Sequence, residues 1–350
     1  MISLSAIRAN YRLVAIVLLF TTVLICQHTY FYVTYRSVGA FYRLSHAETP
    51  FKRLTESDLL HIPGSTKQFA AIDRVYLINL PYRVDRRIGS IGLFQTLDLD
   101  AYIVPAHGAH SSQVESRSHL TKHGVITTME LACWASHMQV WSEIAANRDD
   151  NSWTLIFEDD IDLEWDLVEI LKSFPHDLWN TPDLIYLGYC GNPPGALLYN
   201  GTRNFRVHRA VYPSCTHAYA IQPRTASKLM QLLASPREAI DNSIVNLVRA
   251  GELVAFSIHP PLVLQQSLTS WRPSDVNPVL KSWSYRTRKQ SNAIYEWWRG
   301  VESVSNLKDS TLARVDFLQA DNWRRTNEND FWRSNGTNVS STSHAPSREE

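Results

Sequence analysis

In WTLIFEDDIDLEW, residues 153–165, an apolar run is followed directly by a group of acids. Residues 153–157 show no alternation of polar and apolar side chains, which is the pattern of a strand buried on both faces. Glu158, Asp159 and Asp160 follow directly. Because adjacent carboxylates repel one another and an unpaired buried charge is costly, we expect a partner to hold these acids.

The composition predicts a folded protein with a substantial core. Of the 350 residues, 44% are hydrophobic and 11% aromatic, which is enough for one large domain or two smaller ones. The 34 Lys and Arg residues balance the 34 Asp and Glu residues, so the formal net charge is +0. No polycationic surface is expected, and we predict no nucleic-acid partner.

Strands and helices are expected to alternate along the chain. The clearest helix, residues 127–148, opens with Thr127 and carries Glu130 three residues later, which is the spacing of a capping box. Such alternation predicts an α/β fold, with one sheet between helices on both faces. Further strands are expected at 74–80, 183–190, 217–221 and 253–258, and further helices at 87–98, 165–173, 224–234 and 239–249.

Residues 13–35 contain no Asp, Glu, Lys or Arg. A helix of this length crosses a bilayer core of about 30 Å. A cleaved signal peptide and a buried core helix are the alternatives. The length of the run, the absence of a clear cleavage site and the absence of a polar face favour a transmembrane signal anchor.

The orientation of this span rests on acceptor sites for N-glycosylation, because arginines flank it on both sides. Asn200, Asn335 and Asn338 each open an Asn-x-Ser/Thr triplet C-terminal to the span. Such triplets are usable only in the secretory lumen. We therefore expect a single-pass type II protein with a luminal body, in the Golgi or the endoplasmic reticulum, and the anchor-plus-stem layout favours the Golgi.

Two cysteines, Cys190 and Cys215, lie at either end of a segment rich in Pro, Gly and Asn. An oxidising compartment would let them form a disulfide that closes this loop. Two unrelated buried thiols are the alternative, and the disulfide is favoured.

The domain organisation follows from these patterns and from the loss of periodicity at both ends. We expect a cytosolic tail (1–12), the signal anchor (13–35), a stem (36–70), the main folded domain (71–282), a Trp-rich extension (283–334) and a disordered tail (335–350).

The acids after residue 157 point to a metal site. Ligands of open α/β sheets bind outside the carboxyl ends of strands, and hard oxygen ligands suit Mg²⁺ or Mn²⁺. His259 follows the apolar run 253–258 and is a candidate further ligand, the alternative being an exposed histidine in a Pro-rich turn. The alternative for the acids of residues 158–160 is that they cap the next helix. Asp162 and Glu164 are explained by such capping alone.

Six segments follow one another along the chain: VYLINLPYRVDRR (75–87), MELACWASHMQVW (129–141), LIFEDDIDL (155–163), DLIYLG (183–188), CTHAYAIQPRTASKL (215–229) and HPPLVLQQ (259–266). In this order, the set resembles glycosyltransferase family 25, which includes lipooligosaccharide and procollagen galactosyltransferases. The resemblance implies a GT-A type catalytic domain, a nucleotide-sugar donor that is usually UDP-galactose, a divalent metal at the acidic motif, and inversion at the anomeric carbon.

The resemblance also implies which residues meet the donor. Asn79, Arg83, Asp85 and Arg86 match the family's first motif, where a strand-end loop would meet the nucleotide, and Glu158 of the acidic motif joins this set. An arginine here could pair with a diphosphate. A surface ion pair between Asp85 and a neighbouring arginine is the alternative. Asp159, Asp160 and His259 are the expected metal ligands.

The catalytic candidates are Glu130, His137 and Asp241. Glu130 and His137 lie on the same face of the helix as two tryptophans, Trp134 and Trp141, so a polar pair is embedded in an aromatic face. His137 is therefore either a substrate contact or a core histidine whose hydrogen bonds are made within the protein. An inverting transfer needs a base for the acceptor hydroxyl. Asp241 is our candidate base, and an N-cap aspartate is the alternative.

The leading hypothesis is a luminal, metal-dependent glycosyltransferase that moves a hexose, with galactose favoured, from a UDP-sugar to a glycan or glycoprotein hydroxyl. A glycoside hydrolase is an alternative, but such enzymes use two acids that are well separated in a cleft. The three contiguous acids of this chain fit that arrangement poorly. A catalytically inactive lectin-like or scaffold protein is the other alternative, and metal-dependent UDP binding would discriminate against it.

Overall fold

The computed structural model describes residues 51, 54–122, 124, 126–146, 151–191, 195–265, 307 and 309–311. The predicted signal anchor at 13–35 and the predicted tails at 1–12 and 335–350 lie outside these residues. Within the described ranges, no helix has the length and apolar character needed to cross a membrane. The chain divides into two compact units, Met1–Thr49 and Pro50–Glu350, and all the described elements belong to the second.

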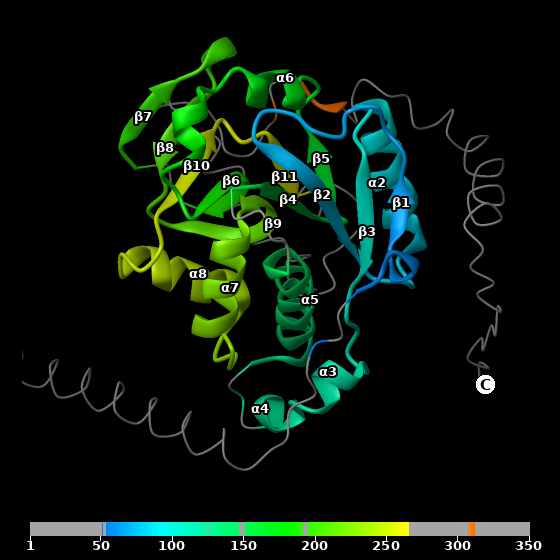
Figure 1. Cartoon of the computed structure of the whole chain (residues 1–350). Coiled ribbons are helices and arrows are strands. Elements are labelled where there is room, and N and C mark those ends of the chain that lie inside the picture. The colour runs from blue at the N-terminus through cyan, green and yellow to red at the C-terminus, as the bar shows by residue number, and fades with distance from the viewer. Residues whose placement is uncertain are drawn as a thin grey trace, which may run out of the picture. The chain divides into compact units, whose positions relative to one another are not determined.

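The core of the fold is a mixed sheet of nine strands in the order β1-β3-β2-β4-β9-β6-β10-β8-β7 (Figure 1). A second sheet pairs β5 with β11 in antiparallel fashion. The strands are β1 Leu60–Ile62, β2 Ile72–Asn79, β3 Ala101–Pro105, β4 Trp153–Glu158, β5 Ile161–Leu163, β6 Leu184–Gly191, β7 Leu197–Asn200, β8 Arg206–Arg209, β9 Pro213–Ile221, β10 Ala255–His259 and β11 Val263–Gln265.

Strand directions bring many carboxyl ends to one edge of the large sheet. β2 is parallel to β3 and β4, and β10 is parallel to β6. β9 is antiparallel to both β4 and β6. The carboxyl ends of β2, β3, β4, β6 and β10 therefore share an edge with the amino end of β9.

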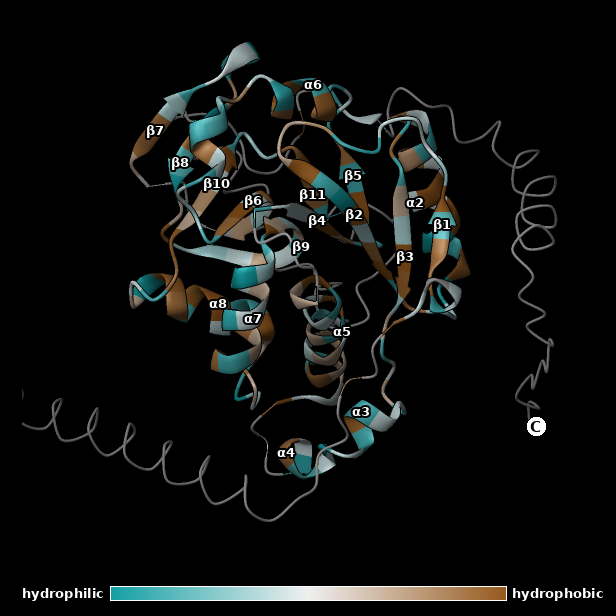
Figure 2. Cartoon of the chain, in the orientation of Figure 1, coloured by the Kyte–Doolittle hydropathy of each residue, from teal (hydrophilic) through white to brown (hydrophobic). Residues whose placement is uncertain are grey.

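Helices cover both faces of the sheet, as the alternation of elements predicts. Helices α5, α7 and α8 pack on one face, and α2 and α6 lie with β5 and β11 on the other. Figure 2 shows both hydrophobic and hydrophilic residues along α7 and α8, as expected of helices with one covered face. The helices are α2 Val84–Thr96, α3 Ser112–Glu115, α4 Ser118–Lys122, α5 Thr128–Ala145, α6 Leu167–Lys172, α7 Pro223–Leu232 and α8 Ile240–Arg249, with short 3-10 turns at Glu56–Asp58, His176–Trp179 and Thr202–Asn204.

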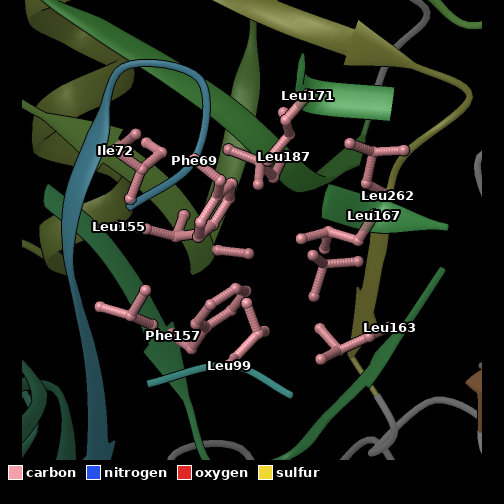
Figure 3. Close-up of a cluster of buried hydrophobic side chains, with 14 of the residues drawn as sticks. Phe69, Ile72, Leu99, Leu155, Phe157, Leu163, Leu167, Leu171, Leu187 and Leu262 are labelled. Atoms are coloured by element: carbon pink, nitrogen blue, oxygen red, sulfur yellow. The ribbon is translucent and has the colours of Figure 1, made fainter. Parts of the chain in front are cut away.

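The apolar run before the acids is β4, and its lack of alternation has a simple cause. Leu155 and Phe157 pack into the hydrophobic cluster on the α2 and α6 face (Figure 3), whereas Ile156 packs into the cluster on the α5 face. Both faces of the strand are covered, so each position from 153 to 157 is buried. The prediction of a fully buried strand is confirmed.

The structure also contains elements that the sequence did not reveal. β1 lies within residues 36–70, which were predicted to be a stem, and it pairs with β3 at the edge of the sheet. A three-residue edge strand is too short to show a period. Ser310, in the predicted extension at 283–334, bridges to Glu164. The folded part thus reaches beyond 71–282 at both ends.

Cys190 and Cys215 form a disulfide, with Cα atoms 5.5 Å apart. This confirms the favoured pairing. The bond joins the carboxyl end of β6 to the amino end of β9, at the edge where the other carboxyl ends meet.

Candidate active site

A pocket opens at the shared edge of the sheet. It lies between the ends of β2, β3 and β4 and the first turns of α5. Its polar lining consists of Arg86, His107, Ser136, His137 and the three acids of residues 158–160. The position agrees with the general rule that ligands of α/β sheets bind outside the carboxyl ends of strands.

Asp159 is a buried carboxylate with strong partners. Arg86 Nη1 lies 2.9 Å from its Oδ1, and Asn79 Nδ2 donates to its Oδ2 at 2.7 Å. Burial raises the pKa of Asp159, although the Arg86 guanidinium and the Asn79 amide oppose this rise. Asn79 also accepts a hydrogen bond from Arg87. Asn79 and Arg86 thereby tie the β2–α2 loop to the acidic motif.

Asp160 has weaker partners than Asp159. Arg86 Nη1 is 3.5 Å from its Oδ2, and Gln265 Nε2 lies 3.3 Å from each of its oxygens. Burial and the neighbouring Glu158 charge raise the pKa of Asp160 to about 8. One guanidinium thus faces two buried carboxylates, and a hard cation would relieve the excess negative charge.

Glu158 faces α5 and β9. His137 Nε2 lies 3.2 Å from Oε1, and Thr216 Oγ1 donates to the same oxygen at 2.8 Å. Burial alone would raise the pKa of Glu158, but the bonds from His137 and Thr216 outweigh it and lower the pKa. The side chain of Glu158 is 22% exposed. Glu158 is therefore an ionised carboxylate that borders the pocket.

His137 is buried in a hydrogen-bonded network. Its Nδ1 is 2.9 Å from the Tyr219 hydroxyl, which also accepts a hydrogen bond from Trp141 Nε1 at 2.8 Å. If the Tyr219 hydroxyl donates to Nδ1, the proton on Nε2 is free to bind Glu158. His137 is 1% exposed, as expected of a core histidine, and it also lines the pocket, as expected of a substrate contact.

Arg83 and Asp85 form the surface pair that was the alternative to nucleotide binding. Arg83 Nε and Nη2 contact the two oxygens of Asp85 at 3.0 and 3.1 Å. The Asp85 side chain is 45% exposed. The pair lies at the start of α2, one turn before the buried Arg86.

Glu130 takes part in the capping box at the start of α5, as its spacing predicts. Its Oε2 accepts hydrogen bonds from the Thr127 amide at 2.9 Å and from the Thr127 hydroxyl at 2.8 Å. In return, the Glu130 amide donates to Thr127 Oγ1. The carboxylate of this catalytic candidate is thus engaged by the helix terminus.

Asp241 lies in the first turn of α8, where Ala239 is the N-cap residue. The N-cap alternative for Asp241 is therefore wrong. Its Oδ2 accepts a hydrogen bond from the Cys215 amide at 3.2 Å. Cys215 adopts a positive φ of 67° and precedes Thr216, which contacts Glu158. Asp241 consequently belongs to the same edge as the acidic motif.

His259 lies apart from the acids. It ends β10, which is three strands away from β4, or about 14 Å at the usual spacing of strands. It is buried, so it is not the exposed turn histidine of the alternative reading, and its Nδ1 is 3.0 Å from the Tyr189 hydroxyl. The chain returns through β11, whose Gln265 pairs with Ile161 and contacts Asp160.

Thr216, Tyr219 and Gln265 form hydrogen bonds with predicted site residues, but the sequence did not predict these contacts. Thr216, Tyr219 and Gln265 all fall inside the segments 215–229 and 259–266 that carry the family resemblance. Their partners are 58, 82 and 105 residues away along the chain. Only the strand register could have revealed such contacts.

The comparisons with known proteins match the part of the chain that contains the acidic motif. The family model described as "Glycosyltransferase family 25 (LPS biosynthesis protein)" matches residues 72–190, from the start of β2 to Cys190, one residue before the end of β6. This part of the chain, which carries Asn79, Arg86 and residues 158–160, is therefore similar to a family 25 glycosyltransferase domain.

Two curated relatives from Xenopus laevis extend the match. Procollagen galactosyltransferase 1-A is 30% identical over 195 residues, which cover 51% of this chain and 31% of the relative. Procollagen galactosyltransferase 1-B is 30% identical over 199 residues, covering 50% of this chain and 30% of the relative. The chain therefore spans about a third of the length of these relatives.

Proposed function

We propose that this protein is a metal-dependent hexosyltransferase that moves galactose from UDP-galactose to a hydroxyl of a glycan or glycoprotein. The observation that carries the proposal is the meeting of three acids, residues 158–160, with a single guanidinium, that of Arg86, in a pocket of the part of the chain that matches family 25. The names of the two relatives support galactose as the sugar and a protein-borne acceptor.

The donor would bind in the pocket beside β2, β3 and β4, in a GT-A type fold. We propose that Asn79 and Arg86 shape the loop that meets the nucleotide, because both are already bonded to Asp159. Arg83 and Asp85 lie on the outer side of the same loop and are proposed to contact the donor's ribose or diphosphate.

A divalent cation, Mn²⁺ or Mg²⁺, fits the oxygen-rich acids. We propose Asp160 as its principal ligand and Asp159 as a second one, with Gln265 at the place that His259 was predicted to fill. When bound, the ion would neutralise negative charge that develops on the departing diphosphate. His137 and Thr216 would meanwhile hold Glu158 in one orientation beside it.

Asp241 is the proposed base. Its carboxylate would take the proton of the acceptor hydroxyl while that oxygen bonds to the anomeric carbon and the bond from that carbon to UDP breaks. Attack opposite to the leaving group inverts the anomeric centre. The position of Asp241 beside Cys215, one residue from the Glu158 partner Thr216, supports this role. Glu130 would act indirectly, by fixing the start of α5.

We propose a luminal location for the folded part, with residues 13–35 as a signal anchor in the Golgi or endoplasmic reticulum membrane. The disulfide between Cys190 and Cys215 is compatible with an oxidising lumen. Asn200 is exposed at the end of β7, where an oligosaccharide could be attached.

The test is turnover by the purified protein of UDP-galactose, UDP-glucose and UDP-N-acetylglucosamine, with and without Mn²⁺. We expect Mn²⁺-dependent release of UDP with UDP-galactose, and loss of that release in Asp160→Ala. If no sugar turns over and UDP with Mn²⁺ leaves the thermal midpoint unchanged, the transferase proposal fails and an inactive binding protein becomes the better account.

A further inference from the structure

A second group of potential metal ligands borders the same pocket. The thiol of Cys133, an imidazole nitrogen of His137 and a carboxylate oxygen of Glu158 lie within 4.8 Å of one another. Cys133 is a free cysteine, and all three side chains line the pocket. This donor set of sulfur, nitrogen and oxygen is softer than the all-oxygen set at Asp159 and Asp160.

We propose that Cys133, His137 and Glu158 form a site for a thiophilic divalent cation such as Zn²⁺, separate from the hard-cation site at Asp160. Tetrahedral zinc sites use these ligand types, and a site with three protein ligands keeps one position open. Here the open position would face the pocket.

The scaffold fixes the three ligands before any metal arrives. Cys133 and His137 are four residues apart on α5, so both project from one side of the helix. Glu158 approaches from the end of β4. Because the ligands come from two rigid elements, little ordering would be needed on binding.

The surroundings provide the supporting hydrogen bonds that metal ligands usually have. Tyr219 binds the other ring nitrogen of His137 and is itself held by Trp141. Thr216 binds one oxygen of Glu158. Such partners fix the orientation of a ligating imidazole and carboxylate.

The thiol must lose its proton to bind the metal. Burial and the nearby carboxylates raise the pKa of Cys133. Zinc displaces such a proton, so binding would release it and would tighten as the pH rises. Among the residues that the structure describes, a second group of this kind consists of Cys190, Cys215 and His217, but both of its sulfurs are in the disulfide and are not available.

Occupancy would have a functional consequence, and this one step rests on the proposed transferase activity. A cation held by Glu158 and His137 would occupy the pocket that the donor is proposed to use. Zn²⁺ would therefore inhibit a Mn²⁺-dependent transfer.

The direct test replaces Zn²⁺ with Co²⁺ in the full-length protein in detergent. We expect a thiolate-to-cobalt absorption band that saturates at one ion per chain and is abolished by added Zn²⁺. Cys133→Ser should lose the band. Cys26→Ser, which removes the cysteine of the predicted span, and Asp160→Asn should keep it. Absence of the band in the unaltered protein, or its persistence in Cys133→Ser, would overturn the proposal.

A second measurement covers the case in which Cys133→Ser does not fold. Zn²⁺ should slow alkylation of Cys133 in the unaltered protein by about tenfold or more, as expected when a metal holds the thiolate. Mg²⁺ should have no such effect. If Zn²⁺ left the alkylation rate of Cys133 unchanged, the proposed zinc site would be wrong. Both readouts are independent of turnover, so they remain decisive if the transferase proposal fails.

Discussion

Asp159 and Asp160 are neighbours in sequence, yet they lie in different surroundings. Asp159 has a guanidinium at 2.9 Å and an amide at 2.7 Å, whereas Asp160 has the same guanidinium at 3.5 Å and the Gln265 amide at 3.3 Å. Both residues lie in the bend between β4 and β5, and their side chains meet different partners there. A run of acids can therefore combine a structural carboxylate with one that is poised for a cation.

The largest effect is expected from removal of the shared arginine. Arg86→Ala leaves two buried carboxylates without their guanidinium, and it should lower the free energy of unfolding by about 3–5 kcal/mol. Denaturant titration would measure the change. Arg83→Ala removes the pair with Asp85, whose side chain is 45% exposed, so it should cost less than about 1 kcal/mol and serves as the control. Equal losses of unfolding free energy in the two variants would show that Arg86 does not hold the buried carboxylates.

The two aspartates should respond oppositely when they lose their charge. Asp159→Asn removes a charged partner of Arg86 and Asn79, and it should lower the free energy of unfolding by about 2–3 kcal/mol. Asp160→Asn removes an unfavourable charge and should raise the free energy of unfolding at pH 8 in EDTA. Thermal and denaturant unfolding of both variants would test this, and a loss of stability in Asp160→Asn would refute it.

The pH dependence sharpens the same contrast. The folded pKa of Asp160 is raised from 3.8 to about 8, so between these values the folded protein keeps a proton that the unfolded chain releases. Metal-free protein should therefore lose stability as the pH rises from about 4 to 8, by up to about 1.4 kcal/mol per pH unit from this group. Asp160→Asn should flatten that part of the profile. An unchanged profile would show that Asp160 does not carry the proton.

A smaller effect is expected on the Glu158 side of the motif. Tyr219→Phe leaves His137 Nδ1 and Trp141 Nε1 without their hydroxyl partner, and it should cost about 1–3 kcal/mol of unfolding free energy. Tyr199→Phe, at an intermediate position on the edge strand β7, is a matched control with little expected change. If Tyr219→Phe were as stable as the unaltered protein, the network would not be holding His137.

The smallest effect is expected at the start of α5. Glu130→Ala removes half of the capping box and should cost about 0.5–1 kcal/mol, with UDP release retained. Thr127→Ala should cost a similar amount because it removes the reciprocal bond. Loss of activity without loss of stability in Glu130→Ala would instead assign the carboxylate a direct role.

Much of the fold follows from local patterns. The buried strand before the acids and the capping box at Thr127 were readable because each depends on residues close together in sequence. The disulfide was a favoured alternative, since the spacing of Cys190 and Cys215 suggested a closed loop. β1 was missed because a short edge strand has too little period to detect.

The site was harder to predict, because its partners meet across the sheet. The placement of His259 as a metal ligand assumed that every strand end lies near the acids, but strand order puts β10 three positions from β4. Gln265 reaches Asp160 only because β11 turns back to pair with β5. The strand order and the pairing of β11 with β5 depend on residues far apart in the sequence, so the spacing of neighbouring residues does not predict them.

The most direct test of the central claim is calorimetric binding of UDP in the presence of Mn²⁺ to Asp160→Asn, with Asp162→Asn as the matched control. The Asp162 carboxylate accepts a hydrogen bond from Ser310 and lies two residues beyond Asp160. We predict that Asp160→Asn weakens Mn²⁺-dependent UDP binding by about tenfold or more, as expected for the loss of a ligand, while Asp162→Asn changes it by less than about twofold. Unaltered binding by Asp160→Asn would contradict the assignment of Asp160 as the residue that holds the cation.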